Sequence, residues 1–98
     1  MGLFTDHMYA DWYGNAIEVE AKVAGLDSRI EYSLFINGQR VDTAYAMMGK
    51  FTLRGEVSVN SEKYPAIVWV KQGLFGTTYH LEINGQTFKM QKAQKRRH

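Results

Sequence analysis

The chain has 98 residues, with 12 Lys or Arg and 10 Asp or Glu and a formal net charge of +2. That length supports one hydrophobic core but not a second. The sequence contains no cysteine, which excludes disulfides and thiolate metal sites and favours a cytoplasmic protein, and no run approaches the roughly 20 apolar residues of a membrane-spanning helix.

The first fifteen residues are open to two interpretations. Apolar side chains between Leu3 and Trp12 fit the spacing of a short amphipathic helix. Alternatively, residues 8–13 form a strand that turns at Gly14-Asn15 into the next segment, and we favour this strand. Residues 16–24 then alternate between apolar and charged side chains, which is typical of a strand with one buried face.

Residues 29–45 form the first predicted hairpin, because Asn37-Gly38 lies at the centre of an alternating segment. Asn-Gly supplies the positive φ angles of a two-residue type I′ turn. On one face this turn pairs Ile36 with Gln39, Leu34 with Val41, Tyr32 with Thr43 and Ile30 with Tyr45. On the other face it pairs Phe35 with Arg40, Ser33 with Asp42 and Glu31 with Ala44.

Two further strands are predicted before the second hairpin. Residues 50–59 alternate, with Gly55 in the apolar phase, where a glycine marks a bulge or a close approach of another chain segment. A turn follows at residues 60–63. Residues 66–70 are apolar on both faces, which predicts a central strand covered on both sides.

Asn84-Gly85 predicts the second hairpin in the same way. Its register pairs Leu81 with Phe88, Tyr79 with Met90, Glu82 with Thr87 and His80 with Lys89. Both hairpins contain Tyr-x-Leu-x-Ile-Asn-Gly-Gln, which indicates either an internal duplication or convergence on one favourable hairpin.

Together these elements predict an all-β fold, a small antiparallel sandwich or barrel of six to seven strands with two Asn-Gly hairpins. Residues 1–91 are expected to form a single domain, and residues 92–98 a basic, flexible tail. That tail holds four of the 12 basic residues and no acidic one, so residues 1–91 carry 8 basic and 10 acidic side chains, a balance of −2. The basic character therefore belongs to the tail.

Part of the chain resembles the Fas apoptotic inhibitory molecule family. Residues 73–86, read as Gly-Leu-Phe-Gly-Thr-Thr-Tyr-His-Leu-Glu-Ile-Asn-Gly-Gln, are similar to a Gly-Phe loop that leads into Tyr-x-Leu-Glu-Ile-Asn-Gly in that family. Upstream, Ile36-Asn-Gly38 followed by Gly49-Lys-Phe-Thr-Leu-Arg-Gly55 is similar in order and spacing. The resemblance covers about residues 30–90 and implies one β-sandwich domain without enzymatic activity that binds proteins in the cytoplasm.

Three places are candidates for binding a partner. Leu74 and Phe75 are apolar residues at a strand connection between two glycines; they either enter a partner's pocket or, as is more usual, fold back onto the end of the sandwich. Phe35 points away from the predicted core opposite Arg40, either as a cation–π pair and contact patch or as part of a covered face. Trp69 poses the same alternative.

A second class of partner is single-stranded nucleic acid, bound by an aromatic sheet face together with the basic tail. The tail residues that would contact phosphate are Lys92, Lys95, Arg96 and Arg97. Four cations make few phosphate contacts, and the rest of the chain is slightly acidic. We therefore expect a nucleic-acid partner less than a protein partner or a second copy of the chain.

No catalytic or metal-binding pattern stands out. His7, His80 and His98 have no recognisable nucleophile or second ligand at a meaningful spacing; Asp6, His7 and Asp11 would cluster only on a helix. We expect no enzyme activity and no cofactor. A non-catalytic protein-interaction module, acting through self-association or a protein partner, is the leading hypothesis, ahead of the nucleic-acid binder and of a ligand-binding barrel or enzyme.

Overall fold

In the computed structural model, which describes residues 4–24, 29–46 and 49–93, every regular element is a β-strand and all strand pairs are antiparallel. One sheet has the order β4-β3-β2-β1-β9, with β1 Phe4–Trp12, β2 Asn15–Ala24, β3 Arg29–Ile36, β4 Gln39–Ala46 and β9 Gln91–Lys92. The other has the order β5-β6-β7-β8, with β5 Gly49–Val59, β6 Glu62–Gly73, β7 Gly76–Ile83 and β8 Gln86–Lys89.

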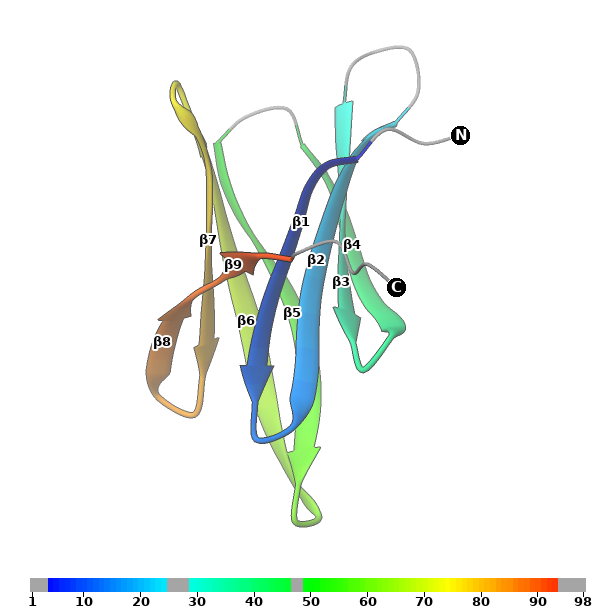
Figure 1. The fold of residues 1–98 in the computed structure, drawn as a ribbon, viewed down its shortest axis with the longest axis vertical. Coiled ribbons are helices and arrows are strands. Elements are labelled where there is room, and N and C mark those ends of the chain that lie inside the picture. Colours follow the sequence, from blue (N-terminus) through cyan, green and yellow to red (C-terminus); the bar gives the residue numbers. More distant parts are fainter. Residues whose placement is uncertain (1–3, 25–28, 47–48, 94–98) are drawn as a thin grey trace.

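The predicted all-β antiparallel fold is therefore confirmed (Figure 1). The prediction of six to seven strands was too low, since nine are described. One of the additional strands arises because the last predicted strand splits at Met90. Residues 86–89 pair with β7, and the chain then crosses to the other sheet, where Tyr9 pairs with Gln91 and Met8 with Lys92. This crossing joins the two sheets along one edge. Ala93 extends the contact by donating its N–H to the carbonyl of His7 at 2.8 Å.

Within the described part of the N-terminal segment, Phe4–Trp12 form a strand, as favoured, and the helical alternative is wrong for these residues. Its turn lies one residue earlier than predicted, at Tyr13-Gly14, whose φ angles are 48° and 78°. Trp12 pairs with Asn15. As a result, Asp6 and His7 lie on opposite faces of β1 and cannot cluster with Asp11 as a helix would arrange them.

The first hairpin has the predicted turn but a different register beyond it. Ile36 pairs with Gln39 and Phe35 with Arg40, after which a bulge at Val41 places Leu34 opposite Asp42. The predicted pairs of Leu34, Tyr32 and Ile30 on the core face, and of Ser33 and Glu31 on the other, are therefore shifted by one residue. Tyr45 consequently pairs with Glu31 on the outer face instead of with Ile30.

The physical reason for the bulge lies in the other sheet. The bulge turns the Asp42 side chain towards β5, where its Oδ2 accepts the backbone N–H of Arg54 at 2.8 Å. This contact links β4 and β5, which are edge strands of different sheets and are not joined by a backbone ladder. A bulge and an inward-facing carboxylate are both common ways of blocking an exposed sheet edge from pairing with another chain.

The second hairpin follows its predicted register for Leu81 with Phe88, Glu82 with Thr87 and His80 with Lys89. Met90 is no longer in the ladder, although its N–H still bonds to the Tyr79 carbonyl at 3.0 Å. β6 is longer than predicted and includes Pro65. This proline is accommodated because it lies beyond the end of β7, where β5 is the only described strand that pairs with β6.

The core fills the space between the inner faces of the two sheets. Its buried residues are Met8, Trp12, Ile17, Val19, Ala21, Tyr32, Leu34, Ile36, Leu53, Val57, Ala66, Val68, Val70, Tyr79, Leu81, Ile83 and Met90. Gly55 marks a close approach, as predicted, since a Cβ at this position would lie 2.8 Å from Ile36 Cδ1 and 2.9 Å from Val41 Cγ2.

The turns at the two ends of the sandwich differ in character (Figure 1). One end carries four two-residue turns: Tyr13-Gly14, Asn37-Gly38, Asn60-Ser61 and Asn84-Gly85, all with positive φ. The β6–β7 turn, Leu74-Phe75, lies at the opposite end and follows the last β6–β7 pair, Gly73 with Gly76.

Candidate interaction surfaces

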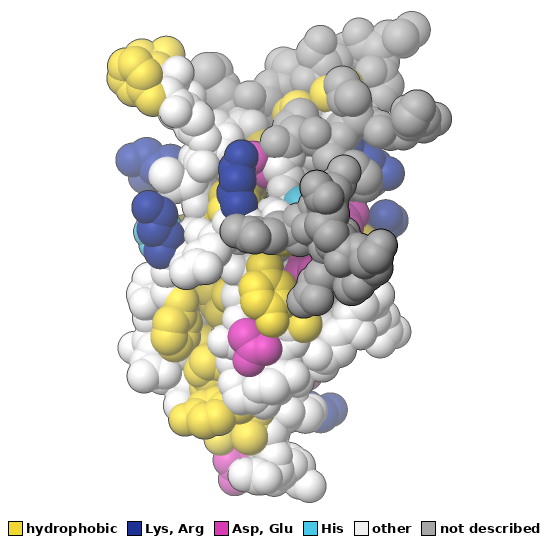
Figure 2. Space-filling view, viewed as in Figure 1, with side chains coloured by type: hydrophobic (Ala, Val, Ile, Leu, Met, Phe, Trp, Pro, Cys, Tyr) yellow, Lys and Arg dark blue, Asp and Glu magenta, His cyan; other side chains and the backbone are white. Residues whose placement is uncertain are grey.

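The β6–β7 tip, defined as Leu74 and Phe75, is the most exposed apolar feature of the described residues. Leu74 is 92% exposed and Phe75 101% exposed. Figure 2 shows an isolated apolar cluster at the end where Figure 1 places this turn. The expectation that these side chains fold back onto the sandwich is therefore wrong. The pairing of Gly73 with Gly76 extends the ladder to the base of the tip and holds it away from the core.

Two lysines lie directly opposite one another below the tip. Lys50 on β5 pairs with Lys71 on β6, and Lys71 pairs in turn with Thr78 on β7. Both lysines are exposed, and neither takes part in an ion pair within the described residues. Like charges directly opposite each other in a sheet are unfavourable, so this pair leaves positive charge available beside the tip.

Sequence reasoning missed this lysine pair, although the signal was present. A two-residue turn at Asn60-Ser61 pairs Val59 with Glu62, and counting back along the two strands brings Lys50 opposite Lys71. Asn60-Ser61 has positive φ at both positions, 52° and 68°. The sequence alone predicted only a four-residue turn there, so no register followed from it.

Trp69 lies on the outer face of the same sheet and is 46% exposed. Its indole N–H donates to Glu82 Oε1 at 2.9 Å, and its direct neighbours across the strands are Thr52 and His80. The expected cover over both faces of residues 66–70 is present only on the core side. Trp69 is thus an aromatic surface whose orientation is fixed by a hydrogen bond.

The outer face of the other sheet holds Phe35 and Arg40. The Arg40 guanidinium lies 5.7 Å from the Phe35 ring centroid, so the predicted cation–π geometry is formed, and Phe35 is half-buried. Nearby, the Arg29 guanidinium lies 5.3 Å from the ring of Tyr45. The Tyr45 hydroxyl also donates to Glu31 at 3.0 Å. Aromatic rings on this face are therefore engaged by neighbouring side chains.

The predicted basic tail begins inside the described residues. Lys92 is exposed in β9, where it pairs with Met8. Lys95, Arg96 and Arg97 lie outside the described residues, as does His98. Of the four predicted phosphate-contacting residues, the structure therefore places Lys92 alone, in the sheet that does not contain Trp69.

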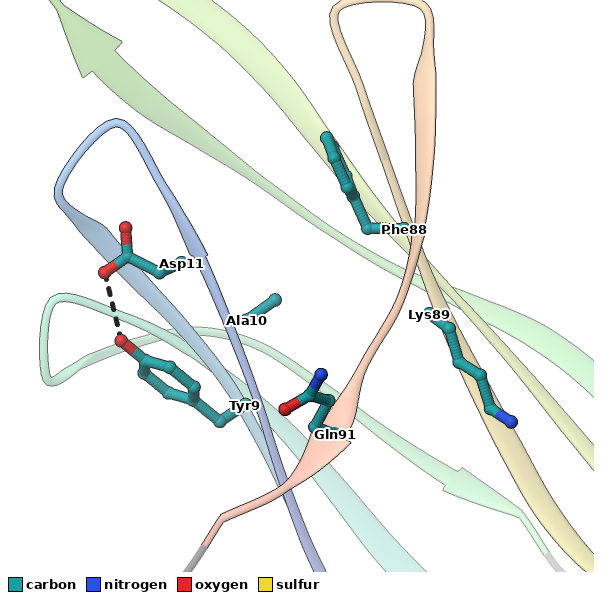
Figure 3. A pocket seen from close by; sticks show the side chains of 6 residues that line it. All are labelled: Tyr9, Ala10, Asp11, Phe88, Lys89 and Gln91. Carbon is teal, nitrogen blue, oxygen red and sulfur yellow. Dashed lines mark hydrogen bonds between the residues drawn. The ribbon is translucent and has the colours of Figure 1, made fainter.

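An open hollow of about 300 Å³ lies where the two sheets meet at β1, β8 and β9. Its lining consists of Tyr9, Ala10, Asp11, Phe88, Lys89 and Gln91. Figure 3 shows Tyr9 and Asp11 on one side of β1 and Phe88 and Lys89 on the other. Asp11 already accepts hydrogen bonds from the Tyr9 hydroxyl at 3.0 Å and from the Gly14 N–H at 3.2 Å. These polar groups do not converge on a common point, as a ligand pocket would require.

The described histidines occupy the outer faces. His7 contacts Glu18 at 3.3 Å and Glu20 at 3.9 Å, and His80 lies between Trp69 and Lys89 on the opposite sheet. In the part of the chain that is described, no three histidine, aspartate or glutamate side chains come together as metal ligands would. The described residues also contain no helix of the length and apolarity needed to cross a membrane.

Two tyrosines place hydroxyls between the sheets. Tyr79 on β7 donates to Asp6 Oδ2 on β1 at 2.8 Å, and Tyr32 on β3 accepts a hydrogen bond from Gln72 Nε2 on β6. Burial raises the pKa of Tyr79 far above its usual value, with the Asp6 carboxylate adding to the effect, and burial also raises the pKa of Tyr32. These hydrogen bonds join the two sheets and serve stability. The sequence pattern identified both rings as core residues but not their partners.

Comparison with protein-family models, with curated proteins and with solved structures finds no match to this chain. The resemblance to the Fas apoptotic inhibitory molecule family therefore stays a prediction.

Proposed function

We propose that this chain is a non-catalytic interaction module that attaches to its partner through the β6–β7 tip. The observation that carries the proposal is the exposure of two adjacent, wholly apolar side chains, Leu74 and Phe75. The same chain closes other hairpins with polar pairs such as Asn37-Gly38. An apolar pair is not needed to close the β6–β7 hairpin, and its exposure to water is unfavourable until a partner covers it.

The partner is not a second copy held by the tip alone. Stable protein interfaces bury roughly 1,200–2,000 Å² in total, whereas two tips would contribute only two side chains from each copy. We therefore expect the purified chain to be monomeric across a concentration series in light scattering. A mass that rises with concentration and returns to the monomer value in Phe75→Ser would instead identify self-association through the tip.

The proposal is tested by photo-crosslinking in a cell extract that retains its membranes. A photoreactive phenylalanine analogue replaces Phe75, and the matched control carries it at Gln86, which is exposed beside the Asn84-Gly85 turn. We expect defined adducts, with protein or with lipid, from position 75 and none of these from position 86. Identical adducts from both positions, or no adduct from position 75, would overturn the proposal.

Trp69 favours a second candidate function, binding of single-stranded nucleic acid. Its half-exposed indole lies one row from the Lys50–Lys71 pair on the same face, and base stacking on an aromatic ring combined with nearby cations is the usual basis of such binding. If this is right, titration with a single-stranded oligonucleotide at low salt quenches the fluorescence of Trp69. The quenching can be attributed to Trp69 because the other tryptophan, Trp12, is buried. A titration without quenching or binding at low salt contradicts this second function.

A further inference from the structure

We infer that the partner met by the β6–β7 tip is an anionic membrane surface. Leu74 and Phe75 would enter the boundary between headgroups and acyl chains, while Lys50 and Lys71 lie at the level of the lipid phosphates. The inference rests on the proposed function, because it names the partner of the same tip.

The chemistry of the tip favours a bilayer over a protein pocket. Residues that anchor protein interfaces are enriched in Trp, Tyr and Arg, whose polar groups are satisfied by specific partners in the pocket. Leu74 and Phe75 carry no polar side-chain group and are surrounded by solvent. A membrane interface takes up such side chains without requiring any shape or hydrogen bond from them.

The charges below the tip are complementary to anionic lipid. On the outer face, the pair nearest the tip is Gly73 with Gly76, which has no side chains. The next two cross-strand rows contain Lys50, Lys71 and Thr78, then Thr52, Trp69 and His80. None of these is acidic; the first carboxylate along β7 on this face is Glu82, in the row that follows. Two lysines held side by side without a carboxylate are unfavourable in the isolated protein, and lipid phosphates would relieve their repulsion.

The spacing of lysines and tip fits the depth of a membrane interface. Lys71 precedes Leu74 by three residues, and at about 3.3 Å per residue this separates them by roughly 10 Å along the hairpin. Apolar anchors at a membrane surface reach about 5–10 Å into the boundary between headgroups and acyl chains. The lysine ammonium groups would then lie among the phosphates when the tip is inserted.

The opposite end of the sandwich supplies an internal control. Lys63 is an exposed lysine on the same strand as Lys71. It lies beside the Asn60-Ser61 turn, at the end of the sandwich that carries the four positive-φ turns and is called the polar end below. Replacing either lysine by glutamine removes one positive charge from β6. Only the Lys71 change should weaken membrane binding, because Lys63 faces away from the membrane when the tip is inserted.

The experiment is sedimentation of the full chain with vesicles of phosphatidylcholine alone or mixed with phosphatidylserine, at low and at moderate salt. We expect binding to the anionic vesicles only. One basic residue near such a surface contributes about fivefold in affinity, so Lys71→Gln should weaken binding by about that factor and Lys63→Gln by less than twofold. Leu74→Ser/Phe75→Ser should weaken it at least tenfold, because apolar insertion is lost.

A spectroscopic readout follows the tip directly. The chain has no native cysteine, so Leu74→Cys can be labelled uniquely with an environment-sensitive dye. Its emission should shift to the blue with anionic vesicles and stay unchanged with phosphatidylcholine alone. Equal losses from Lys71→Gln and Lys63→Gln, or binding that survives the double serine change, would indicate general electrostatic adsorption and overturn the inference.

The failure of this inference is distinguishable from the failure of the proposed function. If the chain does not bind anionic vesicles at low salt while position 75 still crosslinks to a protein, the membrane inference is wrong and the proposed interaction module is retained. If position 75 yields no adduct at all, both are wrong.

Discussion

Two turns of the same two-residue length behave in opposite ways in this protein. At Asn37-Gly38 the Asn37 side chain accepts the Ala16 N–H at 2.9 Å and donates to Asn15 Oδ1 at 2.9 Å, and its backbone N–H donates to the Ala16 carbonyl at 2.8 Å. At Leu74-Phe75 both side chains extend into solvent. Both turns close an antiparallel pair, but only the first is tied to a third strand.

The two turns differ in what the fold requires of their side chains. The residue types in the turns of the polar end are accounted for by the fold, because these turns need positive φ angles and hydrogen bonds. The tip residues are not explained in this way. Under the proposed function, the core and the polar turns stabilise the fold and the tip binds the partner.

The largest expected effect is a loss of stability at alkaline pH. It arises from Tyr79, a buried residue of the core. Below pH 10 Tyr79 is protonated in both the folded and the unfolded chain. Above pH 10 the unfolded tyrosine loses its proton, whereas burial beside Asp6 raises the pKa of the folded one. The unfolding free energy should therefore fall as pH rises above 10, by up to about 1.4 kcal/mol per pH unit for this group.

Urea unfolding at a series of pH values measures that slope. Tyr79→Phe should flatten it, at the cost of a roughly constant loss of about 1 kcal/mol from the missing hydrogen bond to Asp6. The matched control is Tyr13→Phe, an exposed position, which should leave the slope unchanged. An alkaline slope of the same size in Tyr79→Phe would show that other groups are responsible.

The next largest effect is a difference in unfolding free energy between alanine variants of two asparagines in equivalent turns. Asn37 and Asn84 have nearly the same φ, 53° and 51°, so alanine at either position costs about 1 kcal/mol of left-handed strain. Asn37 also bonds to Ala16 and Asn15. We expect Asn37→Ala to lower the unfolding free energy by about 2 kcal/mol and Asn84→Ala by about 1 kcal/mol. Equal losses in urea unfolding would mean that the bonds to the third strand contribute nothing.

The contrast between these turns also explains what the sequence could predict. The Asn-Gly turns and their first pairs depend on local φ preferences and on alternation, and those predictions are confirmed. The bulge at Val41 has its cause in the backbone of Arg54 on the other sheet, which no local pattern reveals. Likewise, the split at Met90 depends on a free edge at β1, and the turn at Tyr13-Gly14 places a tyrosine at positive φ, which local rules disfavour.

The candidate site was predicted in position but not in environment. Leu74 and Phe75 stand out in the sequence as apolar residues between glycines. Whether they would be covered depended on the packing at that end of the sandwich, which is a property of the assembled sheets. Lys50 and Lys71 lie 21 positions apart in sequence and meet only through the register of β5 with β6. A charge pair of this kind therefore cannot be predicted until the length of the connecting turn, and with it the strand register, is known.

The smallest expected effect is the one that decides the comparison. Leu74→Ser/Phe75→Ser changes two side chains that are almost fully exposed, and substitutions at such positions usually alter stability by less than about 0.5 kcal/mol. We expect the urea midpoint of this variant to match that of the unmodified chain while binding through position 75 is lost. A destabilisation as large as that of Asn37→Ala would instead mean that the tip residues are needed for folding, and the case for a docking element would lose its basis.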